Sequence, residues 1–251
     1  MKVRLFFGDF KSGIMTSFEN YAAQVFIENR GKRVFRFDYQ GKYYWLKQPE
    51  KLSIIEHLLK PRPKRSFLNE LKILQELARA NAPIPRLVCY TDDYFVLEDA
   101  GKTVSNYVND STLSDEKKIT ILADSCCALI DLHQRGLIHG RPAVRDIAWN
   151  NGAVKFMDFE ARSKSRNQDW WVVRDMLLFF DSLCREEDIS DEMLARVINI
   201  YQQYCPVHYW RLMLDYLRRF RWVYYLLLPF KPIAKKDLKA IYRLFQQLGK
   251  L

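Results

Sequence analysis

The 251 residues are 49% hydrophobic and 14% aromatic, which is enough for a substantial core in one large domain or two small lobes and argues against wholesale disorder. The chain has 40 Lys and Arg residues against 30 Asp and Glu residues, a net charge of +10. This excess indicates an anionic partner such as a nucleotide, a phosphorylated glycan, anionic lipid or nucleic acid, with a basic enzyme that has a solvated surface as the alternative.

Five cysteines without a CxxC pair argue against a cysteine metal site and favour reduced thiols, which are typical of a reducing compartment. The first residues, MKVRLFFGDFKSG, lack the long apolar core and the small-residue cleavage site of a secretory signal, so none is expected, and the sequence has no run of about 18 apolar residues. We therefore expect a cytoplasmic protein without a membrane-spanning helix.

Residues 22–48 are predicted to be β-structure. The segments VFRFDY (34–39) and KYYWLKQ (42–48) alternate apolar with polar residues, and QGK between them is typical of a hairpin turn. Lys47 then lies near the end of the second strand. After the basic loop KPRPKR (60–65), apolar residues recur at helical spacing over 66–82, with Ser66 as the expected N-cap.

Residues 84–99 predict two short strands around a turn at Asp92 and Asp93, and residues 114–136 predict a helix that begins after Ser114 and ends at Gly136. Beyond residue 168 the pattern is helical throughout. The expected fold is therefore of the α+β class, with a β-rich lobe over 1–100, a helical lobe over 101–251 and a cleft between them.

The stretch HGRPAVRDIAWNNGAVKFMDFEAR (139–162) contains the pattern most typical of a functional site. Asp146 and Asp158 lie on either side of a turn at Asn151 and Gly152, so a hairpin would bring both carboxylates to one Mg²⁺ site. In the first lobe, Lys47 on a strand and Glu70 on the next helix are placed to form an ion pair. Each of these features alone is weak, and their order along the chain is what favours phosphoryl transfer.

This order resembles the protein-kinase-like superfamily over about residues 34–183. WLK (45–47) resembles the strand of the nucleotide-phosphate lysine, FLNELKILQEL the helix of its glutamate, and YFVLEDAG the strand and hinge at the adenine, where Glu98 lies. ALIDLHQRGLIHG resembles the helix that enters the catalytic loop, VKFMDFE the strand before the metal-binding aspartate, and QDWWVVRDMLLFFDSL the helix that organises the second lobe. Within the superfamily, the bacterial lipopolysaccharide-core kinases that phosphorylate Kdo or heptose are most similar, followed by RIO-like and related small kinases.

The resemblance implies a two-lobed protein-kinase-like fold with specific roles. Lys47 would orient the phosphates of ATP, Glu70 would hold Lys47, and Asp146 and Asp158 would bind Mg²⁺. The resemblance also implies that a further aspartate, Asp175, braces the backbone of the catalytic loop.

Two departures from the family pattern concern the phosphates and the catalytic base. Arg141 occupies the position of the base, and an arginine cannot accept a proton at neutral pH. A glycine-rich loop is absent, and Gly31 in NRGKR is at best a minimal hairpin over the phosphates. Asp146, Glu160 or a phosphate oxygen could take the substrate proton instead. His139 is expected to pack inward and bond to backbone near Asp158, and His133 to be structural or solvated.

Residues 207–236 mix aromatic residues with Arg and Lys. The favoured interpretation is that the aromatics fill the core of the helical lobe and the cations are solvated. The alternative is a surface suited to an anionic membrane leaflet, since the apolar run WVYYLLLPF is too short to cross a bilayer. Nucleic-acid binding is not expected, because no reader motif is present.

The function expected from these observations is that of an ATP- and Mg²⁺-dependent kinase. Its acceptor would be a sugar hydroxyl of an acidic, lipopolysaccharide-core-like glycolipid at the inner face of the cytoplasmic membrane. The alternatives are a pseudokinase scaffold or regulator, for which Arg141 argues, and a protein or small-molecule kinase of the same fold.

Overall fold

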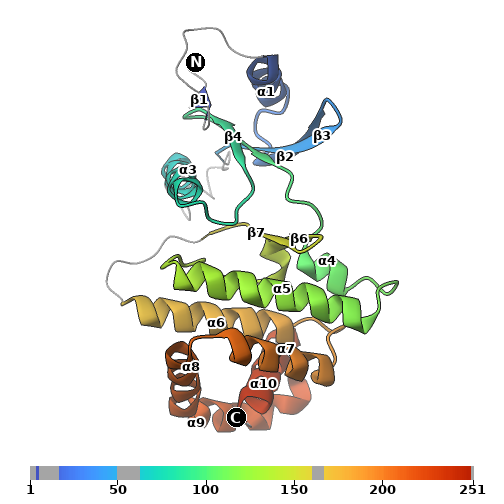
Figure 1. Ribbon diagram of the computed structural model, residues 1–251, viewed down its shortest axis with the longest axis vertical. Helices are drawn as coiled ribbons and strands as arrows, with labels where there is room; N and C mark the ends of the chain where they lie inside the picture. Colours follow the sequence, from blue (N-terminus) through green and yellow to red (C-terminus); the bar gives the residue numbers. More distant parts are fainter. Residues whose placement is uncertain (1–3, 6–16, 50–62, 160–166, 250–251) are drawn as a thin grey trace. The chain divides into compact units, whose positions relative to one another are not determined.

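The computed structural model describes residues 4–5, 17–49, 63–159 and 167–249 (Figure 1). The chain divides into two compact units, Met1–Ala100 and Gly101–Leu251. Among the described residues, the first unit holds an antiparallel sheet and the helices α1 and α3, and the second unit is mainly helical, so the expected α+β class is confirmed. All five cysteines are free thiols, and Cys127 is the exposed one among them.

The first unit is built on a five-stranded antiparallel sheet. Its strands are β1 (Arg4–Leu5), β2 (Val34–Tyr39), β3 (Lys42–Lys47), β4 (Leu87–Tyr90) and β5 (Phe95–Glu98), and their spatial order is β1-β4-β5-β3-β2. Gln40 and Gly41 both have positive φ, of 53° and 76°, as a two-residue hairpin of this twist requires. The expected hairpin of residues 34–47 and the expected strand pair of residues 84–99 are both confirmed.

The prediction that residues 22–33 belong to β-structure is wrong, because they lie in and just after helix α1 (Ser17–Glu28). Ala22, Val25 and Phe26 recur at helical spacing and pack in one cluster with Leu46 and Val96 of the sheet. A short apolar run such as this one does not distinguish a strand from a helix. The apolar face that α1 buries against the sheet is what makes it a helix.

Helix α3 (Pro63–Arg79) covers the opposite face of the sheet. The ring of Phe67 stacks on that of Phe95 at 5.3 Å, whereas Val96, the next residue in β5, packs on the α1 side. The helix was expected to begin after Ser66, but it begins at Pro63, and Ser66 lies within its first turns. Proline is well suited to a first helical position because its fixed φ is already helical.

The second unit is a group of helices with one β-hairpin, and its helical content is as expected. The elements are α4 (Val104–Val108), α5 (Asp115–Gln134), η1 (Val144–Asp146), β6 (Ile147–Asn150), β7 (Ala153–Phe156), α6 (Gln168–Cys184), α7 (Asp191–Tyr204), α8 (Val207–Arg219), α9 (Arg221–Leu227), η2 (Leu228–Ile233) and α10 (Lys236–Leu248). Ser114 caps α5 by accepting the N–H of Lys117 at 3.3 Å, as predicted.

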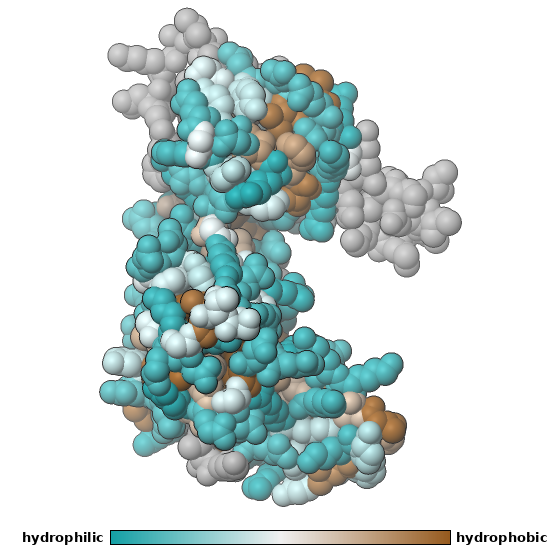
Figure 2. Space-filling model, turned by 90° about the vertical axis from the view of Figure 1, so that its right-hand side faces the viewer, coloured by the Kyte–Doolittle hydropathy of each residue, from teal (hydrophilic) through white to brown (hydrophobic). Residues whose placement is uncertain are grey.

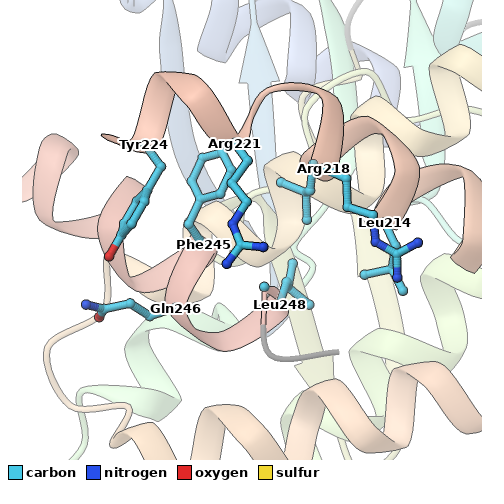
Figure 3. Close-up of a pocket in the computed structure, with 9 residues that line it drawn as sticks. Leu214, Arg218, Arg221, Tyr224, Phe245, Gln246 and Leu248 are labelled. Carbon is cyan, nitrogen blue, oxygen red and sulfur yellow. The ribbon is translucent and has the colours of Figure 1, made fainter. Parts of the chain in front are cut away.

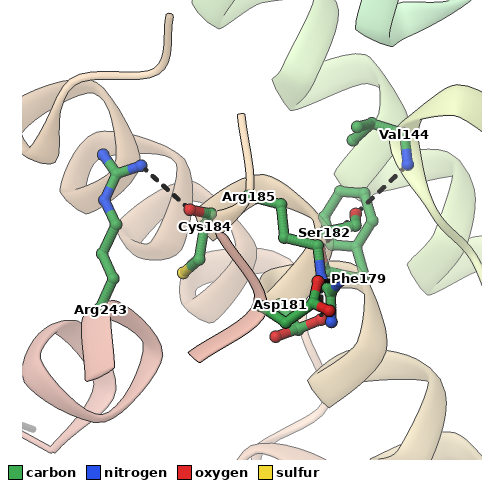
Figure 4. A network of polar contacts seen from close by, with 8 residues as sticks. Val144, Phe179, Asp181, Ser182, Cys184, Arg185 and Arg243 are labelled. Carbon is green, nitrogen blue, oxygen red and sulfur yellow. Dashed lines mark hydrogen bonds and ion pairs between the residues drawn. The ribbon is translucent and has the colours of Figure 1, made fainter. Parts of the chain in front are cut away.

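Arg243 of α10 connects the ends of two other helices in this unit. Its guanidinium donates to the backbone carbonyls of Cys184 (3.5 Å), Glu186 (3.3 Å) and Ile189, and to the carboxylate of Asp191 (2.6 Å). Figure 4 shows its bond to Cys184, together with the bond from Val144 of η1 to the hydroxyl of Ser182 in α6. The last carbonyls of a helix have no partner within the helix, so Arg243 supplies donors that α6 itself lacks.

Candidate functional site

Lys47 and Glu70 form an ion pair inside the first unit. Lys47 is the last residue of β3, and because successive side chains of a strand point to opposite faces, it lies on the face opposite Leu46. Leu46 packs with α1, so Lys47 points toward α3, where Glu70 is. The side chains are 14% and 29% exposed. The pairing predicted from the sequence is confirmed.

The two other residues predicted to contact a nucleotide in this unit are already bonded. Gly31 does not lie in a strand hairpin but in the turn from α1 to β2, with a φ of 95°, and its N–H donates to Oε1 of Gln48 at 3.5 Å. The amide of Gln48 also donates to the carbonyls of Asn29 and Lys32 and so holds this turn in place. The carboxylate of Glu98 accepts from Arg86 at 3.5 Å. The predicted roles of Gly31 and Glu98 toward a nucleotide stay predictions.

The β6–β7 hairpin brings Asp146 and Asp158 together at its open end. Asn151 and Gly152 form the two-residue turn, with φ of 46° and 90°, and Ile147 pairs with Phe156. Asp146 directly precedes β6, and its carbonyl accepts the N–H of Met157 at 2.8 Å, which extends the pairing by one step. The expected convergence of the two aspartates is therefore confirmed at the level of the backbone.

Burial raises the pKa of the Asp146 carboxyl, and the nearby carboxylate of Asp158 raises it further. Arg145 and Arg141 act in the opposite direction. The Oδ2 atom of Asp146 is buried and forms an ion pair with Nε of Arg145 at 3.6 Å, which is longer than a hydrogen bond. A buried carboxylate oxygen that has only this long contact with a cation, beside a second carboxylate, is an environment that favours a bound metal ion.

Asp158 itself has an uncommon backbone conformation, with a φ of 55°. This left-handed region is sparsely populated by residues other than glycine, although Asp and Asn tolerate it better than most. Such residues are concentrated at functional sites, where the surrounding structure enforces the conformation. The side chain is exposed, whereas that of Asp146 is only 13% exposed.

Within the described parts of the chain, no group of three or more His, Cys, Asp or Glu side chains is placed to hold a metal ion. A pair of carboxylates still fits Mg²⁺, which is usually bound by one or two carboxylates and completes its octahedron with water and substrate phosphates. The donor set is all oxygen, as that ion requires, and the oxygen of Asp146 that lacks a hydrogen bond is one of its candidate ligands.

Residues 135–143 form the loop between α5 and η1. Arg141 lies in this loop with an exposed side chain, and its backbone N–H donates to Nδ1 of His139 at 3.3 Å. The imidazole of His139 is fully buried and stacks on the ring of Phe159 at 4.5 Å. Burial lowers the pKa of His139 to about 4, against the opposing effect of Asp175. His139 is thus a neutral structural group that packs inward, as predicted.

The loop that carries these residues is held by a buried carboxylate of α6. Asp175 is completely buried and accepts the backbone N–H groups of His139 (2.8 Å) and Gly140 (2.9 Å). It also lies 3.2 Å from Nε2 of His133. The bracing role predicted for Asp175 is confirmed.

His133 was expected to be structural or solvated, and it is structural, buried against Asp175. Two supporting residues were not identified from the sequence: Arg174 donates to the carbonyl of Gly140, and Ser182 accepts the N–H of Val144 at 3.2 Å. The only signal in the sequence was the spacing of Asp175 and Ser182, which places them two turns apart on one face of α6. Glu160, one of the proposed proton acceptors, lies outside the described residues.

Among the described helices, none has the length and apolar character needed to cross a membrane.

Comparison with known proteins finds a relative but no family model that matches. The chain is 56% identical over 229 residues to an uncharacterized protein of Haemophilus influenzae. The matched region covers 91% of this chain and 95% of the relative, so the similarity extends over both units. The chain therefore belongs to the same family as this Haemophilus influenzae protein.

Proposed function

We propose that this protein is an ATP- and Mg²⁺-dependent phosphotransferase that acts on an alcohol group. The observation that carries the proposal is the pair Asp146 and Asp158 at the open end of the β6–β7 hairpin, where a buried oxygen of Asp146 has only a 3.6 Å ion pair with Arg145. Two oxygen ligands at the end of a rigid hairpin suit a metal that is shared with phosphates.

The proposal gives each group of residues a separate role in this chemistry. Lys47, oriented by Glu70, binds nucleotide phosphates through its ammonium group. Asp146 and Asp158 hold Mg²⁺, which when bound neutralises charge on the phosphate oxygens. Asp175 positions the loop by fixing the N–H groups of His139 and Gly140, so the carboxylates need little reorganisation.

The proposed fold is the two-lobed protein-kinase-like fold, with Met1–Ala100 and Gly101–Leu251 as its two lobes. Support comes from the order of the motifs along the chain and from three local contacts. These are the pairing of Lys47 with Glu70, the hairpin between Asp146 and Asp158, and the bonds from the loop to Asp175.

Arg141 replaces the general base of the family pattern and takes a different role in this proposal. A guanidinium donates hydrogen bonds and cannot accept a proton, so Arg141 contacts the acceptor or the transferred phosphoryl group. Loss of a general base typically lowers a rate by about 10²–10⁴-fold. Because phosphoryl transfer has a loose transition state, positioning and charge neutralisation supply most of the acceleration, and a proton can leave late to Asp146 or a phosphate oxygen.

The proposed acceptor is a sugar hydroxyl of an acidic, lipopolysaccharide-core-like glycolipid at the cytoplasmic face of the membrane. The net charge of +10 and the exposed Arg141 in the loop both favour an anionic acceptor.

The proposal is tested by incubating the purified protein with labelled ATP, Mg²⁺ and acidic core glycolipid. We expect label on the glycolipid, and we expect Asp158→Asn to abolish the transfer. Asp188→Asn, at an exposed aspartate of the same unit away from the loop, is the matched control and should retain it. Transfer that is absent, or equal in Asp158→Asn and wild type, contradicts the proposal.

A second candidate function is that of a nucleotide-binding pseudokinase, which Arg141 at the base position favours. The two functions differ in whether label is transferred. A pseudokinase is stabilised by Mg-ATP through Lys47 but transfers no label to glycolipid, protein or small-molecule acceptors. A thermal shift with Mg-ATP that is lost in Lys47→Met, without any transfer, would identify this second function.

A further inference from the structure

The segment of α9 and η2 exposes large apolar side chains to solvent. Trp222, Tyr225, Leu226, Phe230 and Ile233 are between 49% and 75% exposed, and neither element contains a buried residue. The favoured expectation, that the aromatics of residues 207–236 fill the core, is confirmed for Trp210 and wrong for this part of the segment.

The arrangement of these side chains follows from helical geometry. Trp222, Tyr225 and Leu226 are spaced i, i+3 and i+4 and therefore share one face of α9. Phe230 and Ile233 continue the apolar series in η2. In Figure 2, brown side chains reach the surface among hydrophilic ones at the end of the helical unit that holds α8, α9 and α10. Large exposed apolar side chains that gather on one segment in this way mark an interaction site.

Cations surround this apolar series without carboxylates among them. Residues 216–236 contain six Arg and Lys residues and no Asp or Glu. The acidic residues on either side are already paired, Asp215 with Arg218 at 3.3 Å and Asp237 with Arg185. The other five cations form no ion pair with any carboxylate in the described part of the chain; they are Arg219, Arg221, Lys231, Lys235 and Lys236. The segment therefore presents uncompensated positive charge.

A pocket of about 400 Å³ lies beside this segment, between α8, α9 and α10 (Figure 3). Its lining combines apolar side chains with two guanidinium groups, and the residues that matter here are Leu214, Leu217, Arg218, Arg221, Phe245 and Leu248. Apolar walls with cations at the same site suit an amphipathic anion, in which a hydrocarbon part adjoins a negative group.

We propose that this face of the protein binds the surface of an anionic phospholipid bilayer. The α9–η2 surface is defined by Trp222, Tyr225, Leu226, Phe230 and Ile233 together with Arg219, Arg221, Lys231, Lys235 and Lys236. The apolar side chains enter the boundary between headgroups and acyl chains, and the cations contact lipid phosphates. Trp and Tyr are the residues enriched at this depth of a membrane.

The charge of the surface distinguishes a bilayer from a second copy of this chain. In a twofold dimer the same surface meets itself, so five uncompensated cations of one copy would face five of the other. Lysine is also depleted in the interfaces between proteins. A negatively charged leaflet attracts the same groups, at about 1 kcal/mol for each basic residue, which is about a fivefold change in the partition coefficient.

The test is flotation of the full chain with vesicles of phosphatidylcholine, with and without phosphatidylglycerol. We expect binding to the anionic vesicles, weaker binding at high salt and little binding to the neutral ones. Lys235→Ala with Lys236→Ala should lower the partition coefficient by about 25-fold. The matched control changes two exposed lysines of the first unit, Lys42→Ala with Lys72→Ala, and should leave the partition coefficient unchanged.

The apolar part of the surface has its own variant and control. Trp222→Ala with Leu226→Ala removes two exposed side chains, so the fold is retained, and binding should fall by at least about tenfold. Ile27→Ala removes a side chain that is 64% exposed in α1 and should have no effect. The tryptophan emission should shift to shorter wavelength with anionic vesicles, and Trp222→Phe should bind but lose most of that shift.

Three results would overturn the inference. They are equal binding to neutral and anionic vesicles, no binding to either, and binding that the four substitutions in the surface do not change. Sedimentation that shows a dimer which Trp222→Ala with Leu226→Ala dissociates would assign the surface to a second copy instead. Membrane binding requires neither nucleotide nor metal, so Asp158→Asn should bind as wild type does, whatever the outcome of the transfer experiment.

Discussion

Asp175 accepts the backbone N–H of Gly140 at 2.9 Å, and this bond connects the middle of α6 to a loop 35 residues earlier in the chain. Its other oxygen accepts the N–H of His139 at 2.8 Å. Two buried amide groups of the candidate loop are thus satisfied by a single carboxylate. The position of the loop depends on a side chain that contacts no proposed substrate.

We predict that Asp175→Ala is among the most destabilising single substitutions in the second unit. The carboxylate is completely buried, and its removal leaves two backbone N–H groups without a partner. Each orphaned group costs about 1–3 kcal/mol, so the free energy of unfolding should fall by roughly 3–5 kcal/mol. Urea denaturation measures it, and Asp169→Ala, at an exposed position of the same helix, should cost about 1 kcal/mol or less.

A double-mutant cycle on Lys47 and Glu70 should reveal a measurable coupling. Both side chains are less than a third exposed, so solvent screens the pair less than a surface pair, and we expect a coupling of roughly 1 kcal/mol. The variants are Lys47→Met, Glu70→Gln and their combination, measured by urea denaturation. The control is the pair Lys72 and Glu76 in α3, the helix of Glu70. Both of its side chains are well exposed, its N–O distance is 3.9 Å, and it should couple by less than about 0.5 kcal/mol. Equal coupling in the two pairs would contradict this prediction.

Parts of the site with a local signal could be predicted from the sequence. The asparagine and glycine of the β6–β7 turn predict a hairpin because both need positive φ, and a hairpin fixes where Asp146 and Asp158 meet. The alternation in β3 placed Lys47 near the strand end, and Ser114 marked the start of α5 through its capping side chain. In each case the relevant geometry lies within a few residues of the motif.

Features that depend on distant packing could not be predicted in this way. The face of α9 that is exposed depends on which side of it meets α8 and α10, and composition alone favoured burial of its aromatics. Arg243 donates hydrogen bonds to carbonyls 54–59 residues earlier in the chain, and no local sequence pattern predicts these contacts. The C-terminal half of α1 was mistaken for a strand because two of its core-facing residues, Val25 and Phe26, are good strand formers.

Arg243→Met should lower the free energy of unfolding, because it removes the guanidinium donors of Arg243 while it keeps the packing of an unbranched side chain. The variant keeps an unbranched apolar chain but leaves the carbonyls of Cys184, Glu186 and Ile189 without these donors. Hydrogen bonds from charged groups contribute about 1.5–3 kcal/mol each, and water can replace part of them, so we expect a loss of roughly 2–4 kcal/mol in urea denaturation. Lys239→Met, at an exposed position of the same helix, should change stability little, and an equal loss would show that charge removal from α10 is the cause.

The buried imidazole of His139 should make the protein less stable in mild acid. Its pKa is about 4 in the folded protein, because burial disfavours the charged form, against about 6.5 in an unfolded chain. Between these two pH values the unfolded chain binds a proton that the folded chain does not. Stability therefore falls as the pH is lowered from about 6.5 to about 4, by roughly 3 kcal/mol from this residue, and its contribution is constant above and below that window.

The measurement is the free energy of unfolding at pH 7 and near the lower end of the window, in wild type and in His139→Gln. The glutamine has an oxygen that can accept the N–H of Arg141, and it carries no titrating ring. The variant should lose the part of the pH dependence that belongs to His139, whereas His208→Gln, at an exposed position, should keep it. If His139→Gln does not fold, the proton resonances of the wild-type imidazole provide the same answer. A ring that titrates near pH 6.5 in the folded protein would mean that solvent reaches the imidazole. Phe159 and α6 would then not shield His139 from water, which would contradict the prediction.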